Sequence, residues 1–416
     1  MFGDDNAERT YRCERRRAVM AGILETASTT FLLLIAVRWF AAGAWAKGLI
    51  ASGGSVGLLL SPFTVKTVES SGWPPAKAAA RVFLAGAVCC AIMTAAPFPS
   101  VFVVGSVLAM ACTSTVVPLL TQIYQENYPE NMRGRLFSRT VMIRIGAAAL
   151  FSDLIGRVLS QHLGRFPAVL GLFAVAFVCS SVWVARCPSR PLRASAGSNP
   201  FRALQYVRSD ALFRRTLICW MLMGFANLMM FPLRVEYLAN PRYGLAFSVS
   251  LVALLVGVIP NLARLIMSPV WGWLFDHMNF FVLRVILNLG FALGIVTFFM
   301  GQDLISLVLG SIVFGVSLAG GDVAWSLWVT KFAPPDRVAD YMSVHTFFTG
   351  VRGVAAPLVA FQVLAQASSA TALRPIMTLG WISAGMILLA SLLLLPEIKF
   401  GRPVRRATVV VEDVAD

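Results

Sequence analysis

Four charged residues inside otherwise apolar runs are the side chains most able to do chemistry in this sequence. Glu25 and Asp322 are carboxylates, and Arg144 and Arg352 are guanidinium groups. An unpaired charge in apolar surroundings is costly, so such groups are expected to pair or to bind a ligand. Three interpretations follow: the carboxylates bind and release protons, the arginines bind an anionic group, or each half of the chain holds one static acid–base pair.

Uncharged polar residues accompany these charges. Glu25, Ser28 and Thr29 have the i, i+3, i+4 spacing that places them on one face of a helix. Polar side chains also interrupt three further apolar runs. The alternative for the hydroxyl groups is a bond to their own helix backbone. The set predicted to bind a solute or protons is Glu25, Ser28, Thr29, Ser114, Arg144, Asn227, Asp322, Trp325 and Arg352.

Three other buried charges are given structural roles. Asp153 and Arg157 are four residues apart and are expected to neutralise each other along one helix. Arg264 is placed near the end of its apolar run, where a long side chain can reach the polar edge. Without the Asp153–Arg157 pair, three arginines remain against two acids, which favours an anionic ligand.

Composition identifies the elements that must position these residues. The chain has 416 residues, 58% hydrophobic and 13% charged, with a mean hydropathy of +0.75. Soluble proteins average about 45–50% apolar and about 25% charged residues. These values exclude a soluble enzyme and predict an all-α polytopic membrane protein, because about 20 apolar residues form a helix that crosses a bilayer. The predicted transmembrane helices are residues 18–39, 48–67, 77–97, 100–123, 139–162, 166–186, 213–237, 246–270, 281–300, 303–330, 341–366 and 376–396.

The predicted domain organisation follows from the gaps between these spans. The longest polar stretch separates two groups of six helices. Within it, Asn199 and Pro200 are expected to cap a short amphipathic helix over residues 201–215. The predicted segments are a tail (1–17), a six-helix bundle (18–187), a linker with the amphipathic helix (188–212), a second six-helix bundle (213–397) and a second tail (398–416).

The distribution of basic residues predicts the orientation. Of 35 lysines and arginines, 25 fall on the side of the two termini and five on the other side. Cytoplasmic loops carry the excess of Lys and Arg, so both termini are expected in the cytoplasm. This distribution also explains the net charge of +15 without nucleic-acid binding. The absence of an N-x-S/T sequence favours a bacterial inner membrane.

The two halves share a pattern. Ser61, Pro62 and Glu69 recur as Ser268, Pro269 and Asp276, each 207 residues later. Pro129 and Ser138 recur as Pro334 and Ser343, each 205 residues later. Because each half has an even number of helices, both copies have the same orientation. The sequence therefore predicts two parallel repeats related by an axis along the membrane normal.

These features resemble the major facilitator superfamily over nearly the whole chain. The segment Gly272-Trp273-Leu274-Phe275-Asp276-His277, with Arg284 downstream, is similar to the family's G-x-L-x-D-R loop signature, although His277 replaces the usual arginine. The first-half copy keeps only Glu69 and downstream basic residues. The resemblance implies the major facilitator fold and a cavity lined by helices one, four, seven and ten, which carry most of the polar residues named above.

A cytoplasmic gate is expected where the loops after the second and eighth spans approach the other half. Asp276 would face the positive helix end near Ser138, and Glu69 the corresponding end near Ser343. Such contacts would exist only while the cytoplasmic side is closed. The predicted gate residues are Glu69, Arg133, Arg135, Arg139, Asp276 and Arg284.

The function predicted from the sequence is secondary active transport of a small polar, anionic organic solute by alternating access, with protons coupled through Glu25 or Asp322. The expected partners are the lipid bilayer and the solute, with no nucleic acid, cofactor or metal, and the chain is expected to be a monomer. Two alternatives share the fold: an efflux antiporter for drugs or metabolites, and a scaffold or ligand sensor that does not transport. A membrane enzyme acting on lipid is disfavoured, because the three histidines lie far apart in the sequence.

Overall fold

The computed structural model describes residues 5–191, 204–331, 338–366 and 373–398. All regular secondary structure in these ranges is helical. The predicted cap at Asn199 and Pro200, most of the linker, and residues 399–416 of the second tail lie outside the described residues.

The first half of the chain forms one helical bundle. Its helix α1 packs against α7 and α8, α3 packs against α5, and α4 packs against α5 and α8. A π-helical turn, η1, joins α1 to α2 without a break in the helix. The elements are α1 (Asp5–Thr26), η1 (Ala27–Phe31), α2 (Leu32–Arg38), α3 (Ala44–Ser71), α4 (Pro75–Ala95), α5 (Pro99–Thr115), α6 (Val117–Asn127), α7 (Glu130–Gln161), η2 (Leu163–Arg165) and α8 (Phe166–Ala185).

The second half forms a second bundle. In it α10 packs against α15 and α16, α12 against α14, and α13 against α14 and α16. A second π-helical turn, η5, joins α11 to α12. The elements are α9 (Gln205–Ser209), α10 (Ala211–Ala239), η4 (Pro241–Tyr243), α11 (Val249–Ala253), η5 (Leu254–Val258), α12 (Ile259–His277), α13 (Phe280–Met300), α14 (Leu304–Leu327), η6 (Trp328–Lys331), α15 (Val338–Ala365), α16 (Leu373–Leu394) and η8 (Leu395–Glu397).

Within the described residues, eleven helical segments are long and apolar enough to cross a membrane. Helix α7 is the twelfth long segment, and its 32 residues span about 48 Å at about 1.5 Å per residue. It is too charged to be counted by composition, because Arg144, Asp153 and Arg157 interrupt its apolar part. The prediction of an all-α membrane protein with twelve crossing helices is therefore confirmed.

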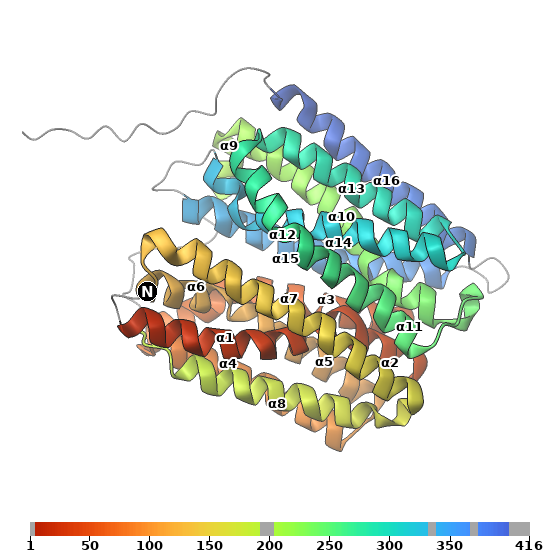
Figure 1. The fold of residues 1–416 in the computed structure, drawn as a ribbon, viewed down its shortest axis with the longest axis horizontal. Helices are drawn as coiled ribbons and strands as arrows, with labels where there is room; N and C mark the ends of the chain where they lie inside the picture. Colours follow the sequence, from red (N-terminus) through yellow and green to blue (C-terminus); the bar gives the residue numbers. More distant parts are fainter. Residues whose placement is uncertain (1–4, 192–203, 332–337, 367–372, 399–416) are drawn as a thin grey trace, which may run out of the picture.

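The two bundles lie side by side, with the N-terminal bundle below the C-terminal bundle in Figure 1. Helix α1 begins and α16 ends at the same end of the molecule, here named the terminal end (Figure 1, left), and the other end is named the opposite end. The bundles contact each other through α3 with α15, and through α7 with α11 and α12. Helices α3 and α15 are the second and eleventh crossings, and α12 and α7 are the eighth and fifth. The repeat relates the second crossing to the eighth and the eleventh to the fifth, so the two contacts are equivalent.

The linker helix is shorter than predicted. Helix α9 ends at Ser209, and α10 begins at Ala211. The Asp210 carboxylate accepts a hydrogen bond from the Phe213 backbone N–H at 2.9 Å, which is the usual N-cap contact. The prediction of one amphipathic helix over residues 201–215 is therefore wrong in its second half, because Asp210 starts a new helix there.

The outer faces of both bundles carry large apolar side chains. Ile266 and Ile305 are 71% and 72% exposed, and Leu150 is 57% exposed. A soluble protein rarely exposes a continuous apolar surface, whereas lipid tails require one. Polar groups are accordingly expected between the helices, where a functional site would lie.

Candidate functional site

Arg264 lies at the centre of a chain of four charged side chains between the bundles. Its Nε donates a hydrogen bond to Oδ2 of Asp322 at 2.6 Å, and its Nη1 donates to Oε1 of Glu25 at 2.5 Å. The other Glu25 oxygen lies 3.1 Å from Nε of Arg144. The Arg264 side chain is only 5% exposed, so these contacts replace its hydration. The residues Arg144, Glu25, Arg264 and Asp322 are named the midplane chain.

The midplane chain draws two residues from each bundle. Glu25 in α1 and Arg144 in α7 belong to the first bundle, and Arg264 in α12 and Asp322 in α14 belong to the second. Arg264 lies fifteen residues after the start of α11 and thirteen before the end of α12, so the chain is near mid-height. Asn261 supports Arg264 with a longer contact of 3.4 Å between its Oδ1 and Nη1 of the arginine. The Arg264–Glu25 pair therefore links the two bundles.

The backbone is adapted to bring these residues together. The π-helical turn η1 begins two residues after Glu25, η5 ends six residues before Arg264, and the two turns contact each other. Such turns are frequent at functional sites. Close helix approach contributes as well: a Cβ at Gly22 would lie 2.4 Å from the Arg144 carbonyl oxygen, and one at Gly315 would lie 2.3 Å from the Pro260 carbonyl oxygen. Larger residues would separate α1 from α7 and α14 from α12.

The predicted pairing of charges is confirmed in part. Glu25 contacts Arg144, and Asp153 pairs with Arg157 at 2.8 Å. The predicted Asp322–Arg352 pair is wrong, because Asp322 accepts from Arg264 while Nη1 of Arg352 donates to the Trp220 carbonyl oxygen.

The role given to Arg264 is also wrong. Its span was predicted to end at residue 270, which places the arginine near a membrane surface. Helix α12 continues to His277, so Arg264 lies near the middle of the crossing.

The other predicted site residues are distributed along the helices around this chain. The hydroxyl groups of Ser28 and Thr29 donate to the Glu25 carbonyl oxygen at 3.0 and 2.9 Å, which is the alternative interpretation given above. Ser114 in α5 and Asn227 in α10 are partly buried. Trp325 in α14 is partly buried and lies 5.7 Å from the ring of His345.

The predicted gate is not assembled in this structure. Arg135, Arg139 and Asp276 are exposed, and the described residues include no ion pair between Asp276 and the start of α7. Nη2 of Arg133 donates to the carbonyl oxygens of Gln125 and Tyr128 within its own bundle. Glu69 is partly buried near the end of α3.

Arg284 requires a correction. The sequence assigns it to the gate as the distal basic residue, at the start of the predicted 281–300 helix, but its side chain is 1% exposed and lies one turn inside α13. The Asn279 side chain accepts from the backbone N–H groups of Phe281 and Val282, so the helix begins at Phe280 and includes Arg284. Arg284 stacks on Trp220 instead, with 3.5 Å between the guanidinium carbon and the ring centroid.

A set of contacts at the opposite end was not predicted. Nζ of Lys47 in α3 lies 2.7 Å from Oε1 of Glu236 in α10, and the two side chains are 10% and 1% exposed. Arg38 donates to the Phe247 carbonyl oxygen at 2.7 Å, also across the bundle boundary. The Lys47–Glu236 pair is named the opposite-end lock. The available signal was Glu236 itself, an acidic residue within the apolar run that ends the seventh span.

The bundles are thus joined unevenly. Between described residues, every hydrogen bond and ion pair that crosses the bundle boundary lies at mid-height or at the opposite end. Helix α2, at the right in Figure 1, also contacts α10 across the boundary. The structure therefore holds the opposite end closed by polar contacts.

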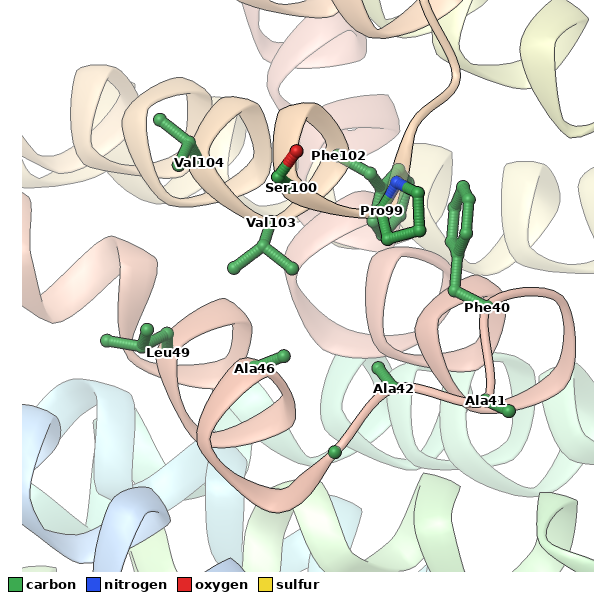
Figure 2. A pocket seen from close by; sticks show the side chains of 11 residues that line it. Phe40, Ala41, Ala42, Ala46, Leu49, Pro99, Ser100, Phe102, Val103 and Val104 are labelled. Atoms are coloured by element: carbon green, nitrogen blue, oxygen red, sulfur yellow. The ribbon is translucent and has the colours of Figure 1, made fainter.

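An apolar pocket of about 510 Å³ lies away from the midplane chain (Figure 2). It is formed by the connection from α2 to α3 and the start of α5, and its lining includes Phe40, Leu49 and Phe102. Ser100 is its one side chain with a polar group, so the pocket does not match the requirements of a charged or strongly polar solute.

Two six-helix bundles around a buried chain of charges define the architecture of a membrane transporter. A sequence profile of the Major Facilitator Superfamily matches residues 77–357, and the chain belongs to this family. It is accordingly an integral membrane protein and a secondary transporter rather than an enzyme. No curated protein sequence matches the chain.

Solved transporters share the fold. A mutant of the nucleoside transporter NupG superimposes with a TM-score of 0.76 at 15% identity, covering 94% of this chain and 100% of that chain. A D-xylose–proton symporter gives 0.65 at 14% identity, covering 94% and 95%. The human organic anion transporter MFSD10 gives 0.62 at 15% identity, covering 93% and 99%. At these identities the similarity shows the fold alone.

Proposed function

We propose that the protein transports a proton together with a small polar organic anion by alternating access, with the midplane chain as the shared binding site. The observation that carries the proposal is the charge balance of this chain. Two arginines face two carboxylates, so the site is neutral while both acids are ionised. One added proton leaves a charge of +1, and a monoanionic solute restores neutrality.

Glu25 is the proposed proton carrier. It is held by both Arg144 and Arg264, so protonation weakens two ion pairs at once. Arg144 is 37% exposed and can then bind the acidic group of the solute with charge-assisted hydrogen bonds. Arg264 keeps Asp322 as its partner, at 2.6 Å, and stays charged in the second bundle. Loss of the Arg264–Glu25 pair frees the bundles to rock against each other.

Uncharged residues complete the proposed site. Oδ1 of Asn227 is buried and has no hydrogen-bond partner among the described residues, so it can accept a hydrogen bond from the solute. Ser28, Ser114 and Trp325 come from η1, α5 and α14, which belong to the first, fourth and tenth crossings. We place the solute between these side chains and Arg144.

In the proposed conformational cycle, the terminal end and the opposite end of the molecule close alternately. We infer from the excess of basic residues that the terminal end faces the cytoplasm. We further propose that the membrane is a bacterial inner membrane and that the chain works as a monomer. The structure then corresponds to an inward-facing state, closed outside by the opposite-end lock. In the outward-facing state, Asp276 would contact the part of α7 near Arg139, with Arg133 and Arg135 beside it, and Glu69 the part of α15 near Ser343. Both positions lie inside their helices, which begin at Glu130 and Val338, so the arginine side chains supply the attraction for Asp276.

Transport in proteoliposomes tests the proposal. Vesicles loaded with one unlabelled organic acid are diluted into its labelled form, for a panel of small mono- and dicarboxylates and neutral sugars as comparison. Exchange of a monoanion in counterflow, together with uptake of protons when the same solute enters vesicles that contain none, supports the proposal. Release of protons against solute entry indicates an antiporter, and no exchange of any compound by folded protein indicates a scaffold or sensor.

A further inference from the structure

A second group of buried cations lies within the C-terminal bundle. Arg284 of α13 and His345 and Arg352 of α15 surround Trp220 of α10. The guanidinium carbon of Arg284 lies 3.5 Å from the Trp220 ring centroid, and the His345 ring centroid lies 5.3 Å from it. Arg352 donates from Nη1 to the Trp220 carbonyl oxygen. These three side chains are named the Trp220 cluster.

The Trp220 cluster is buried, and no carboxylate pairs with it among the described residues. Arg284 is 1% exposed, His345 0% and Arg352 8%. Both terminal nitrogens of Arg284, both ring nitrogens of His345 and Nε of Arg352 have no hydrogen-bond partner among the described residues. The charges that act on Arg284 and His345 include those of the other cluster arginines, and within the described part of the chain no carboxylate is among the groups that act on the three side chains. Two like charges therefore share a space closed to water.

Neighbouring buried polar groups also have no hydrogen-bond partners among the described residues. Asn288 is one turn after Arg284, is 0% exposed, and has neither its amide oxygen nor its amide nitrogen bonded in the described structure. Thr349 is one turn after His345, is 8% exposed, and its hydroxyl is likewise unpartnered among the described residues. Buried polar groups are rarely left without partners, and buried charges still less so. Helices α13 and α15 both contact α10, so several polar groups without partners lie on two helices beside Trp220.

Arg352 packs closely against α10 at Gly224. A Cβ at Gly224 would lie 1.8 Å from Nη1 of Arg352, so the guanidinium group occupies the space that the missing side chain leaves. This contact holds Arg352 beside Trp220 and away from Asp322, whose carboxylate is already bound by Arg264.

We propose that the Trp220 cluster binds a small inorganic anion of halide size. Arg284 and Arg352 supply its charge partners, and Asn288, Thr349 and His345 supply further donors. Because the cluster side chains are at most 8% exposed, the proposed occupant is a monatomic ion rather than an organic acid. It is separate from the midplane chain, and its occupation lowers the buried charge of the two arginines from +2 to +1 independently of the transported solute.

Halide titration of the purified wild-type protein is the first test. Chloride is increased against gluconate at constant ionic strength, and Tm and tryptophan fluorescence are followed. The expected result is a Tm that rises and saturates with chloride, and saturable quenching when bromide replaces chloride beside Trp220. A Tm that is equal in chloride and gluconate overturns the proposal. If inorganic phosphate stabilises the protein as much as chloride does, the assignment to an ion of halide size is wrong.

Variants locate the site. Arg284→Gln is expected to weaken the chloride effect on Tm by about tenfold in half-saturating concentration, which corresponds to about 1.4 kcal/mol. His345→Gln serves as the second variant should Arg284→Gln not fold. Arg157→Gln, whose side chain is 71% exposed, is the matched arginine control and should keep the wild-type response. A bromide response retained in full by both cluster variants contradicts the assignment.

Discussion

The Arg264 guanidinium group of α12 and the Glu25 carboxylate of α1 form an ion pair of 2.5 Å across the boundary between the two bundles. Each residue has a second partner in its own bundle, Asp322 for Arg264 and Arg144 for Glu25. One proton on Glu25 therefore changes the contacts within the first bundle and between the bundles together. This double connection is the physical basis for coupling ion binding to the movement of the bundles.

Removing Arg264 should destabilise the protein strongly. Arg264→Gln leaves two carboxylates without their shared cation, and loss of one partner of a buried pair costs about 3–5 kcal/mol. Each single variant removes the Glu25–Arg264 contact, and the double variant removes that same contact once. The loss of unfolding free energy in Glu25→Gln/Arg264→Gln should therefore be smaller than the sum of the losses in the two single variants. Thermal unfolding in detergent measures these differences. Additive effects within about 0.5 kcal/mol would show that the pair is not coupled.

Arg144 should determine affinity for the solute. In Arg144→Gln the proposed cation for the acidic group is lost, so KM should increase by about tenfold or more, the value of a charge-assisted hydrogen bond of about 1.5–3 kcal/mol. Arg157→Gln, on the same helix but paired with Asp153, is the control. Uptake of the solute by proteoliposomes measures both. An unchanged KM for Arg144→Gln would place the solute elsewhere.

The opposite-end lock should bias the conformational equilibrium. Glu236→Gln removes the charge that holds Lys47, so the opposite end should open more often. Spin labels at the exposed positions His162 and Gln302 report the opposite end, and labels at Gln125 and His277 report the terminal end. The variant should lengthen the first distance and shorten the second. An unchanged pair of distances would mean that the Lys47–Glu236 contact does not hold this end closed.

Close packing of α1 on α7 should be needed for the Glu25–Arg144 contact. A Cβ at Gly22 would lie 2.4 Å from a backbone oxygen of α7, so Gly22→Ala must push the helices apart. Overpacking of this kind costs about 1–3 kcal/mol. Gly146→Ala, on α7 with no heavy atom within 4 Å of its added Cβ, is the matched control. The expected result is a lower Tm and slower transport for Gly22→Ala alone.

Local patterns in the sequence predicted the fold and part of the site. Hydropathy located the crossing helices, and the count of basic residues along the chain predicted their common orientation. The charged residues were visible as interruptions of apolar runs, and Glu25 and Arg144 do meet. Arg264 was misjudged because hydropathy falls before residue 277, although Trp273 and Phe275 continue α12. Because the predicted end of this helix is seven residues too early, the prediction places Arg264 near a membrane surface instead of near the middle of the crossing.

Contacts between the bundles could not be predicted in this way. Lys47 and Glu236 are 189 residues apart, and nothing in their local sequences marks them as partners. Arg264 and Glu25 are 239 residues apart, and their local sequences likewise do not mark them as partners. Such contacts depend on how α3 meets α15 and α7 meets α12, which is a property of the packed helices.

Proton movement during solute uptake tests the central claim most directly. Proteoliposomes containing a pH-sensitive dye receive the solute identified by counterflow, with wild-type protein, Glu25→Gln and the control Asp153→Asn. Wild type and Asp153→Asn should acidify the lumen as the solute enters, while Glu25→Gln should exchange solute without moving protons. Proton uptake by Glu25→Gln at the wild-type ratio to solute would contradict the account.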